Sequence, residues 1–277
     1  MCHDLRTVRR PGGFGPIITG GTMTTFVADR FAGKTALITG TGSGIGRAVA
    51  VRLAAEGAQV LAHEINGDAL AETVRIITEA GGTVVGRQGD VTGRDECFAA
   101  VEAAVATFGK LDVLGNVAGI AAGYHMPEQT EESYRRMVAV NQDAPFFLCQ
   151  AAIPHLLETG GNIVNIASNA GINGQAYTVS YCMTKGAVIQ LTKALAMEFM
   201  KTNIRINAIA PGGVATTLSN TYQMPGDIDM DLLGRYMGFR GMAQAEELAS
   251  LFSLVACDES VNIHGSVLSS DRGMTAG

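Results

Sequence analysis

Residues 35–46 read TALITGTGSGIG, a short apolar run that leads into four closely spaced glycines. Val49, Leu53 and Ala54 follow at helical spacing, so the pattern predicts a strand, a glycine turn and a helix over residues 46–56. Such a turn brings bare backbone N–H groups to the positive end of a helix, where they can bind a pyrophosphate. A flexible turn is the alternative, but the flanking strand and helix favour a dinucleotide site.

The rest of the chain repeats this alternation of strand and helix. We expect further strands over residues 59–65, 83–88, 111–114, 162–167, 204–210 and 266–269. We expect further helices over residues 68–80, 94–108, 131–159, 179–201 and 243–257, with interruptions near Pro145 and Pro154. Alternating strands and helices build βαβ units. The predicted fold class is therefore α/β, a single-domain doubly wound parallel sheet (Rossmann fold) with helices on both faces.

The N-terminal part of the chain differs from this pattern. Residues 1–29 combine arginines with clusters of Pro and Gly and predict a flexible extension, whereas residues 30–277 form the folded domain. Residues 1–29 lack the continuous apolar segment of a secretory signal. Met23 offers an alternative start, which would place residues 1–22 outside the native protein.

Composition argues against several kinds of partner. Hydrophobic residues make up 47% of the chain and charged residues 17%, and a net charge of −6 disfavours nucleic acid. No apolar run reaches the roughly 18 residues of a membrane helix, so we expect no membrane partner. The five cysteines form no CxxC pair and the five histidines no HExxH spacing. This predicts free thiols, a cytoplasmic protein and no metal.

Glu64 indicates which dinucleotide binds. It ends the second expected strand, 18 residues after Gly46. A carboxylate there can accept hydrogen bonds from both hydroxyls of the adenosine ribose, and it repels the 2′-phosphate of NADP. Ser43 adds no positive charge for that phosphate, and Arg47 is the nearby cation that could reach it. We therefore predict NAD as the cofactor; a surface carboxylate without a ligand is the alternative.

Three side chains point to proton-transfer chemistry. Tyr181 and Lys185 lie four residues apart, on one face of a helix. Tyrosine titrates near pH 10, so a phenolate base near neutrality must be favoured by roughly 3–4 kcal/mol. A lysine ammonium and the positive nicotinamide can supply this. Ser168 directly follows the fifth strand, 13 residues before Tyr181, where its hydroxyl can donate to a substrate oxygen. The alternative is that the pair has no catalytic role, with Tyr181 packed in the core and Lys185 solvated.

The TGxxxGIG stretch at residues 39–46 and the Tyr–Lys pair together resemble the short-chain dehydrogenase/reductase family, over roughly residues 30–277. The resemblance implies a catalytic tetrad of Asn141, Ser168, Tyr181 and Lys185. Tyr181 would be the general acid/base, and Ser168 would hold the substrate oxygen. Lys185 would lower the pKa of Tyr181 and bind the nicotinamide ribose. Asn141 would hold a water that links Lys185 to solvent.

The resemblance also implies the cofactor contacts. Asp90 and Val91 would hold the adenine, and Val214 and Thr216 the carboxamide. Val117 stands where the family has a second asparagine, which removes a polar side chain from that turn. The expected cofactor-binding residues are Gly40, Ser43, Gly44, Ile45, Gly46, Glu64, Asp90, Val91, Asn116, Ala118, Gly119, Tyr181, Lys185, Pro211, Gly212, Val214 and Thr216.

The implied activity is NAD-dependent interconversion of a secondary alcohol and a ketone, with a small-molecule substrate. A 3-oxoacyl thioester (acyl-carrier-protein) reductase that uses NADPH is one alternative, and a non-catalytic dinucleotide-binding sensor is another. By the same resemblance, residues 215–242 form the substrate lid. Its apolar residues are Leu218, Tyr222, Met224, Met230, Leu232, Leu233, Tyr236, Met237, Phe239 and Met242. They predict either an apolar pocket that adapts its shape to the substrate or an amphipathic helix packed on the core. Arg272 replaces a frequent family glycine, and the sequence assigns it no role.

We also expect a homotetramer. The helices over residues 131–159 and 179–201 carry more apolar residues than one core stripe requires: Val140, Ala144, Phe147, Leu148, Ala151, Ala152, Val188, Leu191, Leu195 and Phe199. The final strand exposes a sheet edge, and soluble oligomers are mostly closed two-fold assemblies. Tetramers are also frequent in the family that the chain resembles. The alternative is that all these residues serve the core of a monomer.

Overall fold

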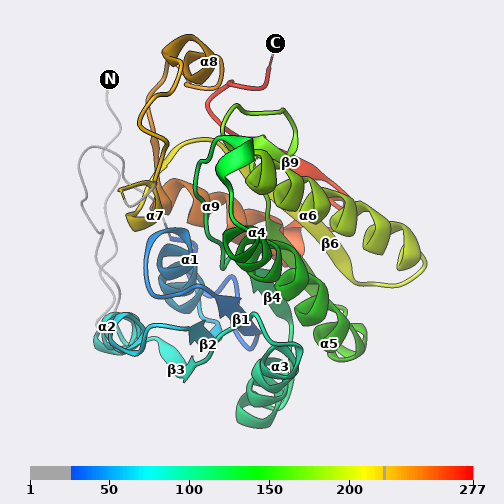
Figure 1. Cartoon of the computed structure of the whole chain (residues 1–277). Helices are drawn as coiled ribbons and strands as arrows, with labels where there is room; N and C mark the ends of the chain where they lie inside the picture. The colour runs from blue at the N-terminus through cyan, green and yellow to red at the C-terminus, as the bar shows by residue number, and fades with distance from the viewer. Residues whose placement is uncertain (1–25, 221–222, 277) are drawn as a thin grey trace, which may run out of the picture.

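The computed structural model describes residues 26–220 and 223–276, and its centre is one parallel sheet of seven strands (Figure 1). The strands are β1 (Thr35–Thr39), β2 (Gln59–Glu64), β3 (Thr83–Gln88), β4 (Val113–Asn116), β5 (Asn162–Ile166), β6 (Arg205–Pro211) and β9 (Val267–Ser270). Their order across the sheet is β3-β2-β1-β4-β5-β6-β9. The strand order reverses between β1 and β4, where Leu37 pairs with Leu61 on one side and with Leu114 on the other. Ligands bind at the carboxyl ends of strands at such a reversal.

Helices cover both faces of the sheet, as the sequence predicts (Figure 1). One face carries α1 (Gly44–Ala55), α2 (Gly67–Glu79) and α9 (Ala245–Ala256), and the other α3 (Arg94–Phe108), α5 (Ala144–Thr159) and α6 (Val179–Glu198). Leu53 of α1 and Phe252 of α9 belong to one apolar core cluster. Val101 of α3 and Leu148 of α5 belong to the cluster on the opposite face. The fold class is thus confirmed as a doubly wound α/β sheet.

Local sequence signals set several helix ends. The Asn66 side chain accepts a hydrogen bond from Ala69 N at 3.0 Å and so caps the first turn of α2. Gly81, with φ of +83°, follows the end of α2, and Gly109, also at +83°, ends α3. Glycine adopts this left-handed conformation without steric cost, which is why these helices stop there.

The long helical region after β4 differs from the expectation. It divides into α4 (Glu131–Val138), a π-helical turn at Ala139–Asp143 and α5, so an interruption does precede Pro145. The expected interruption near Pro154 is wrong, because α5 continues through Pro154 to Thr159. Ile153 and Leu156 beside it are buried against the core. We infer that this packing compensates the hydrogen bond that proline cannot donate.

The lid region is tied together at its base. It contains β7 (Val214–Ala215), α7 (Thr217–Asn220), α8 (Met230–Gly234) and β8 (Ala243–Gln244). Val214 pairs with Ala243, so the two ends of this region are joined in a separate two-stranded sheet. The helix α8 buries none of its residues, which counts against a helix packed on the core. The expected lid residue Tyr222 lies outside the described residues.

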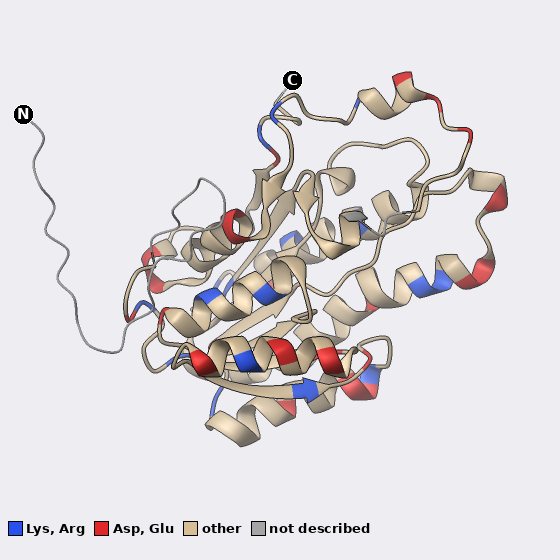
Figure 2. Ribbon diagram, turned by 90° about the vertical axis from the view of Figure 1, so that its left-hand side faces the viewer, with Lys and Arg blue, Asp and Glu red and all other residues tan. Residues whose placement is uncertain are grey.

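Charges on the described surface are mixed. Figure 2 shows acidic and basic residues interspersed along α2, where Arg75 pairs with Glu72 and Glu79. Within the described residues, no helix combines the length and apolar character needed to cross a membrane. Val27 N donates to Glu56 Oε1 at 3.1 Å, so contacts with the domain already occur before residue 30. Cys97, Cys149, Cys182 and Cys257 are free thiols, whereas Cys2 lies outside the described residues.

Candidate active site

A cleft of about 360 Å³ opens at the carboxyl ends of β1, β2 and β4. It lies where the strand order reverses, the place at which doubly wound sheets bind ligands. Eleven of the expected cofactor-binding residues line it, namely Gly40, Ser43, Gly44, Ile45, Gly46, Glu64, Asp90, Val91, Ala118, Gly119 and Thr216.

Glycines form the floor of this cleft because side chains do not fit there. A Cβ on Gly40, whose φ is +70°, would lie 2.7 Å from Ala118 Cα. A Cβ on Gly46 would lie 2.0 Å from the Gly40 carbonyl oxygen. The N-cap residue of α1, Ser43, makes no side-chain capping bond. The positive end of α1 therefore meets the cleft through bare backbone, which fits the pyrophosphate of a dinucleotide.

Glu64 stands at the end of β2 with its carboxylate held in place. Its Oε2 accepts from Gly42 N at 2.8 Å, and its Oε1 accepts from Asn66 N at 3.0 Å. Arg47 points elsewhere: its guanidinium donates to Thr73 Oγ1 at 2.9 Å and to the carbonyl oxygen of Gly42. Glu64 therefore brings a negative charge to this end of the cleft, whereas Arg47 does not line the cleft and is hydrogen-bonded to Thr73 and to backbone carbonyl oxygens.

Asp90 also has fixed partners at the cleft wall. Its Oδ1 accepts from Thr92 N at 3.1 Å, and its Oδ2 accepts from Arg136 Nη1 at 3.0 Å. Arg136 comes from α4 and lines the cleft, as do Ile120 and Val140. These three residues were not predicted, since no short motif links them to the glycine loop.

Ser168, Tyr181 and Lys185 meet beside this cleft. Ser168 follows β5, and its hydroxyl lies near enough to the Tyr181 phenol to lower the pKa of that phenol. Its Oγ also accepts from Ala170 N at 3.1 Å. Lys185 is buried, donates to the Ile166 carbonyl oxygen at 2.8 Å, and lies 5.9 Å from the centre of the Tyr181 ring. The structure therefore brings these three predicted side chains together at one sheet edge.

Asn141 lies in the π-helical turn between α4 and α5. Its Oδ1 accepts from Ile120 N and its Nδ2 donates to Ile120 O, both at 2.8 Å. A Cβ on Gly119 would lie 3.3 Å from Asn141 Oδ1 and 3.4 Å from Lys185 Nζ. Gly119 thus connects the cofactor cleft to Asn141 and Lys185. Single π-turns inside α-helices frequently mark functional sites.

Burial dominates the electrostatics of Tyr181 and Lys185. Burial raises the pKa of Tyr181, and the Ser168 hydroxyl opposes this rise only in part. Burial lowers the pKa of Lys185 to about 8. The expected lowering of the Tyr181 pKa relies on the positive nicotinamide as well as on Lys185, so it stays a prediction for the NAD-bound protein. Burial favours the uncharged form of each group, so it raises the pKa of the phenol and lowers the pKa of the ammonium.

Six expected cofactor residues do not line the cleft; two of them, Tyr181 and Lys185, belong to the group of side chains beside it. Asn116 is buried, and its Nδ2 donates to Asn165 Oδ1 at 2.8 Å, while its neighbour Val117 lines the cleft instead. The others, Pro211, Gly212 and Val214, lie at the end of β6 and in β7. A Cβ on Gly212 would lie 2.9 Å from Asp271 Cα. This turn therefore supports the base of the lid in the described structure.

Contacts with two loops hold residues 215–242, the segment expected to form the lid. His125 Nε2 lies 2.7 Å from Asp227 Oδ1, and Asp229 N donates to the Tyr177 hydroxyl at 2.7 Å. Arg272, which sequence reasoning left without a role, donates to the Arg240 carbonyl oxygen at 2.7 Å. It also donates to the Glu247 carboxylate at 2.9 Å. Arg272 thus joins the end of the chain to the lid and to α9.

The chain is similar to known proteins over most of its length. The family model for short chain dehydrogenase matches residues 34–225. The chain is 40% identical over 253 residues to 2,5-dichloro-2,5-cyclohexadiene-1,4-diol dehydrogenase of Sphingobium indicum, covering 91% of this chain and 100% of the relative. It is 34% identical over 256 residues to cyclohexanol dehydrogenase of an Acinetobacter species, covering 92% and 100%.

A solved structure gives the same result. The short chain dehydrogenase from Mycobacterium paratuberculosis bound to NAD has a TM-score of 0.83 with this chain at 31% identity, covering 90% of this chain and 100% of that one. The protein therefore belongs to the short chain dehydrogenase family. It is an oxidoreductase of this family, whose members bind a nicotinamide dinucleotide.

Proposed function

We propose that the protein is an NAD-dependent dehydrogenase that interconverts a secondary alcohol and a ketone, with Tyr181 as the general acid/base. The observation that carries this proposal is the convergence of Ser168, Tyr181 and Lys185 beside a glycine-floored cleft. Residues 30–277 would form the catalytic domain, with residues 215–242 as its substrate lid.

The glycine floor and Glu64 fit a dinucleotide, and the residues that would hold it follow from their places in the cleft. The loop at residues 40–46 would hold the pyrophosphate, Glu64 the adenosine ribose, and Asp90 and Val91 the adenine. Bound nicotinamide supplies the hydride acceptor for alcohol oxidation and the hydride donor for ketone reduction. Glu64 supports NAD over NADP because its carboxylate would repel a 2′-phosphate and Arg47 is engaged elsewhere.

The side chains of the site supply the proton chemistry. Ser168 donates to the substrate oxygen and holds it beside the Tyr181 phenol. Tyr181 accepts the alcohol proton at its phenol oxygen during oxidation and returns it during reduction. Lys185 would hold the nicotinamide ribose, and its positive charge favours the phenolate. Asn141, whose amide is fixed on Ile120, would hold the water that links Lys185 to solvent.

The names of the relatives suggest which alcohols to test first. One relative is named for a cyclic diol and another for cyclohexanol. The lid carries exposed apolar side chains of the kind that contact such rings, including Met230, Leu232 and Met237. We therefore propose cyclic secondary alcohols as the first class of substrate.

A screen of cyclic and open-chain secondary alcohols with NAD⁺ tests the proposal by the appearance of NADH absorbance. We expect turnover of at least one cyclic alcohol, and faster turnover with NAD⁺ than with NADP⁺. Reduction of a 3-oxoacyl thioester with NADPH, in the absence of alcohol oxidation, would instead identify the thioester reductase. Tight NADH binding without turnover of any alcohol or ketone would identify a sensor.

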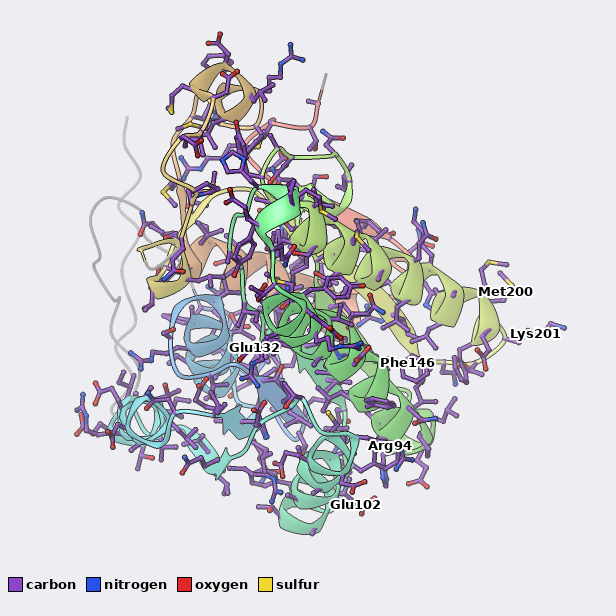
Figure 3. All side chains as sticks on the ribbon, viewed as in Figure 1. Arg94, Glu102, Glu132, Phe146, Met200 and Lys201 are labelled. Carbon is purple, nitrogen blue, oxygen red and sulfur yellow. The ribbon has the colours of Figure 1, made fainter. Side chains whose placement is uncertain are left out.

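We also propose a homotetramer in the cytoplasm, although the structure changes the reason for the assembly. Several residues expected at an interface are buried within the chain itself: Val140, Ala144, Leu148, Ala151, Ala152 and Val188. Other apolar residues on the same helices are exposed, including Phe146 on α5 at 47% and Met183 on α6 at 53%. Phe146 lies in the helical layer nearest the viewer (Figure 3). Light scattering checks this: four times 28.9 kDa is expected, and a monomer mass at micromolar concentration would contradict it.

A further inference from the structure

A second cavity, of about 260 Å³, lies beside the reaction centre and shares no lining residue with the dinucleotide cleft. The segment after Ser168 forms one wall through Asn169 and Gln175. The lid forms another wall through Arg235 and Tyr236, and Thr275 closes the cavity from the end of the chain. The cavity therefore lies between the lid and the segment that carries the site's serine. Its size approaches the lower end of the range for small-molecule sites, about 300 Å³.

Asn169 connects this cavity to Ser168. It is 6% exposed, and its Oδ1 accepts from Ser168 Oγ at 3.2 Å and from Gln175 Nε2 at 3.2 Å. One buried side chain thus contacts the hydroxyl that would hold the substrate oxygen and also lines the cavity. A substrate bound to Ser168 would need to extend only past Asn169 to place a second group in the cavity.

The cavity offers positive charge. Arg235 is the only charged residue among those that line it in the described structure. Carboxylates also occur on the adjoining segments, and Asp231 lies four residues before Arg235 on α8. Asp271 accepts from Gly273 N at 3.0 Å and from Thr275 Oγ1 at 2.6 Å, and Asp227 pairs with His125. An arginine fork in a cavity with amide donors suits a carboxylate, which it can bind through two parallel hydrogen bonds.

We propose that this cavity binds a carboxylate at the far end of the substrate, so that the preferred substrates are secondary hydroxy acids and their keto acids. This inference rests on the proposed dehydrogenase activity. In the reaction, the carbinol carbon loses its hydrogen as hydride to NAD⁺, and the hydroxyl proton leaves through Tyr181. The products are a keto acid, NADH and a proton, and the carboxylate itself is unchanged.

A matched pair of substrates tests the proposal. We would compare kcat/KM with NAD⁺ for a hydroxycyclohexanecarboxylate and for its neutral methyl ester. The wild-type protein should prefer the acid by about tenfold, because a charge-assisted hydrogen bond contributes about that factor. Arg235→Gln should remove this preference while changing kcat/KM for the ester by less than about twofold.

Arg240→Gln is the matched control, because it removes the same charge from the same lid and Arg240 does not line the cavity. It should leave the acid preference intact. Equal kcat/KM for acid and ester in the wild-type protein would overturn the proposal. An equal loss of the acid preference in Arg235→Gln and Arg240→Gln would also overturn the proposal. The total positive charge of the lid would then explain the preference, without a specific site at Arg235.

Binding without chemistry separates this inference from the proposed function. Cyclohexanecarboxylate, which has no alcohol to oxidise, would be titrated calorimetrically into the protein with NAD⁺. We expect binding that Arg235→Gln weakens about tenfold. Such binding without turnover of any alcohol would keep the carboxylate site and refute the dehydrogenase. Oxidation of neutral alcohols without carboxylate binding would keep the dehydrogenase and refute the inference.

Discussion

Replacing Glu64 by alanine should shift the cofactor preference from NAD toward NADP. The Glu64 carboxylate lines the dinucleotide cleft and is held by the backbone N–H groups of Gly42 and Asn66 at 2.8 and 3.0 Å. Its position is therefore set before a cofactor binds. We expect the wild-type protein to bind NAD(H) at least tenfold tighter than NADP(H), which corresponds to about 1.4 kcal/mol.

The size of the shift follows from two effects. Hydrogen bonds from ribose hydroxyls to a carboxylate contribute about 1.5–3 kcal/mol each. The two backbone donors already use part of the hydrogen-bonding capacity of the carboxylate. We therefore expect Glu64→Ala to weaken NAD binding by about 1.5 kcal/mol. Two like charges about 5 Å apart at an effective dielectric constant of about 20 repel by about 3 kcal/mol, and solvent roughly halves this. The NAD-to-NADP affinity ratio should therefore fall by about 3 kcal/mol, roughly a hundredfold.

Titration calorimetry with NADH and NADPH measures the ratio directly. Glu79→Ala is the control, because it removes the same charge from exposed α2, where Glu79 pairs with Arg75. The control should keep the wild-type ratio. An unchanged ratio in Glu64→Ala, or an equal change in the control, would refute the role of Glu64 in choosing the cofactor.

Two further predictions concern the buried parts of the site. Burial lowers the pKa of Lys185 to about 8 in the folded protein, below the value near 10.4 of an unfolded lysine. Burying the charged ammonium lowers the free energy of unfolding. This loss of stability is fully present below about pH 8, and it disappears between about pH 8 and 10.4 because the folded protein has then lost the proton. Lys185→Met should therefore be more stable than wild type by about 1–3 kcal/mol near pH 7, with a smaller difference near pH 10; equal differences in urea unfolding at both pH values would contradict this. Gly46→Ala places a Cβ 2.0 Å from the Gly40 oxygen, so it should lower stability by about 1–3 kcal/mol and abolish NADH binding, whereas Gly93→Ala, which meets nothing within 4 Å, should retain binding.

Sequence reasoning predicted the fold because its signals are local and repeated. The alternation of strand and helix needs only hydrophobic periodicity, and the loop at residues 40–46 needs glycine at each close approach. The convergence of Ser168, Tyr181 and Lys185 was also predictable, because parallel strands end at one edge of the sheet. These features depend on positions within one strand–turn–helix unit or at the end of one strand.

Other features depend on packing between distant segments and were not predicted. The Asn116 side chain turns toward Asn165 in the interior, although the next residues, Val117 and Ala118, line the cleft. The pairing of Arg136 with Asp90 joins residues 46 positions apart, and no spacing rule reveals it. Strands β7 and β8 have two residues each, too few for a hydrophobic period. The raised pKa of Tyr181 depends on burial, which a sequence pattern does not measure.

The most direct test of the central claim is the turnover number of Tyr181→Phe on the alcohol that the wild-type protein oxidises best. The variant lacks only the phenol oxygen, so it should keep the fold and bind NADH nearly as tightly as wild type. Tyr134→Phe, which changes a tyrosine on α4 that is 39% exposed, should behave as wild type. We predict that kcat of Tyr181→Phe falls by at least about a hundredfold, as expected for the loss of a general acid/base. A variant that binds NADH and keeps most of its activity would contradict the assignment of Tyr181 as the proton-transferring group.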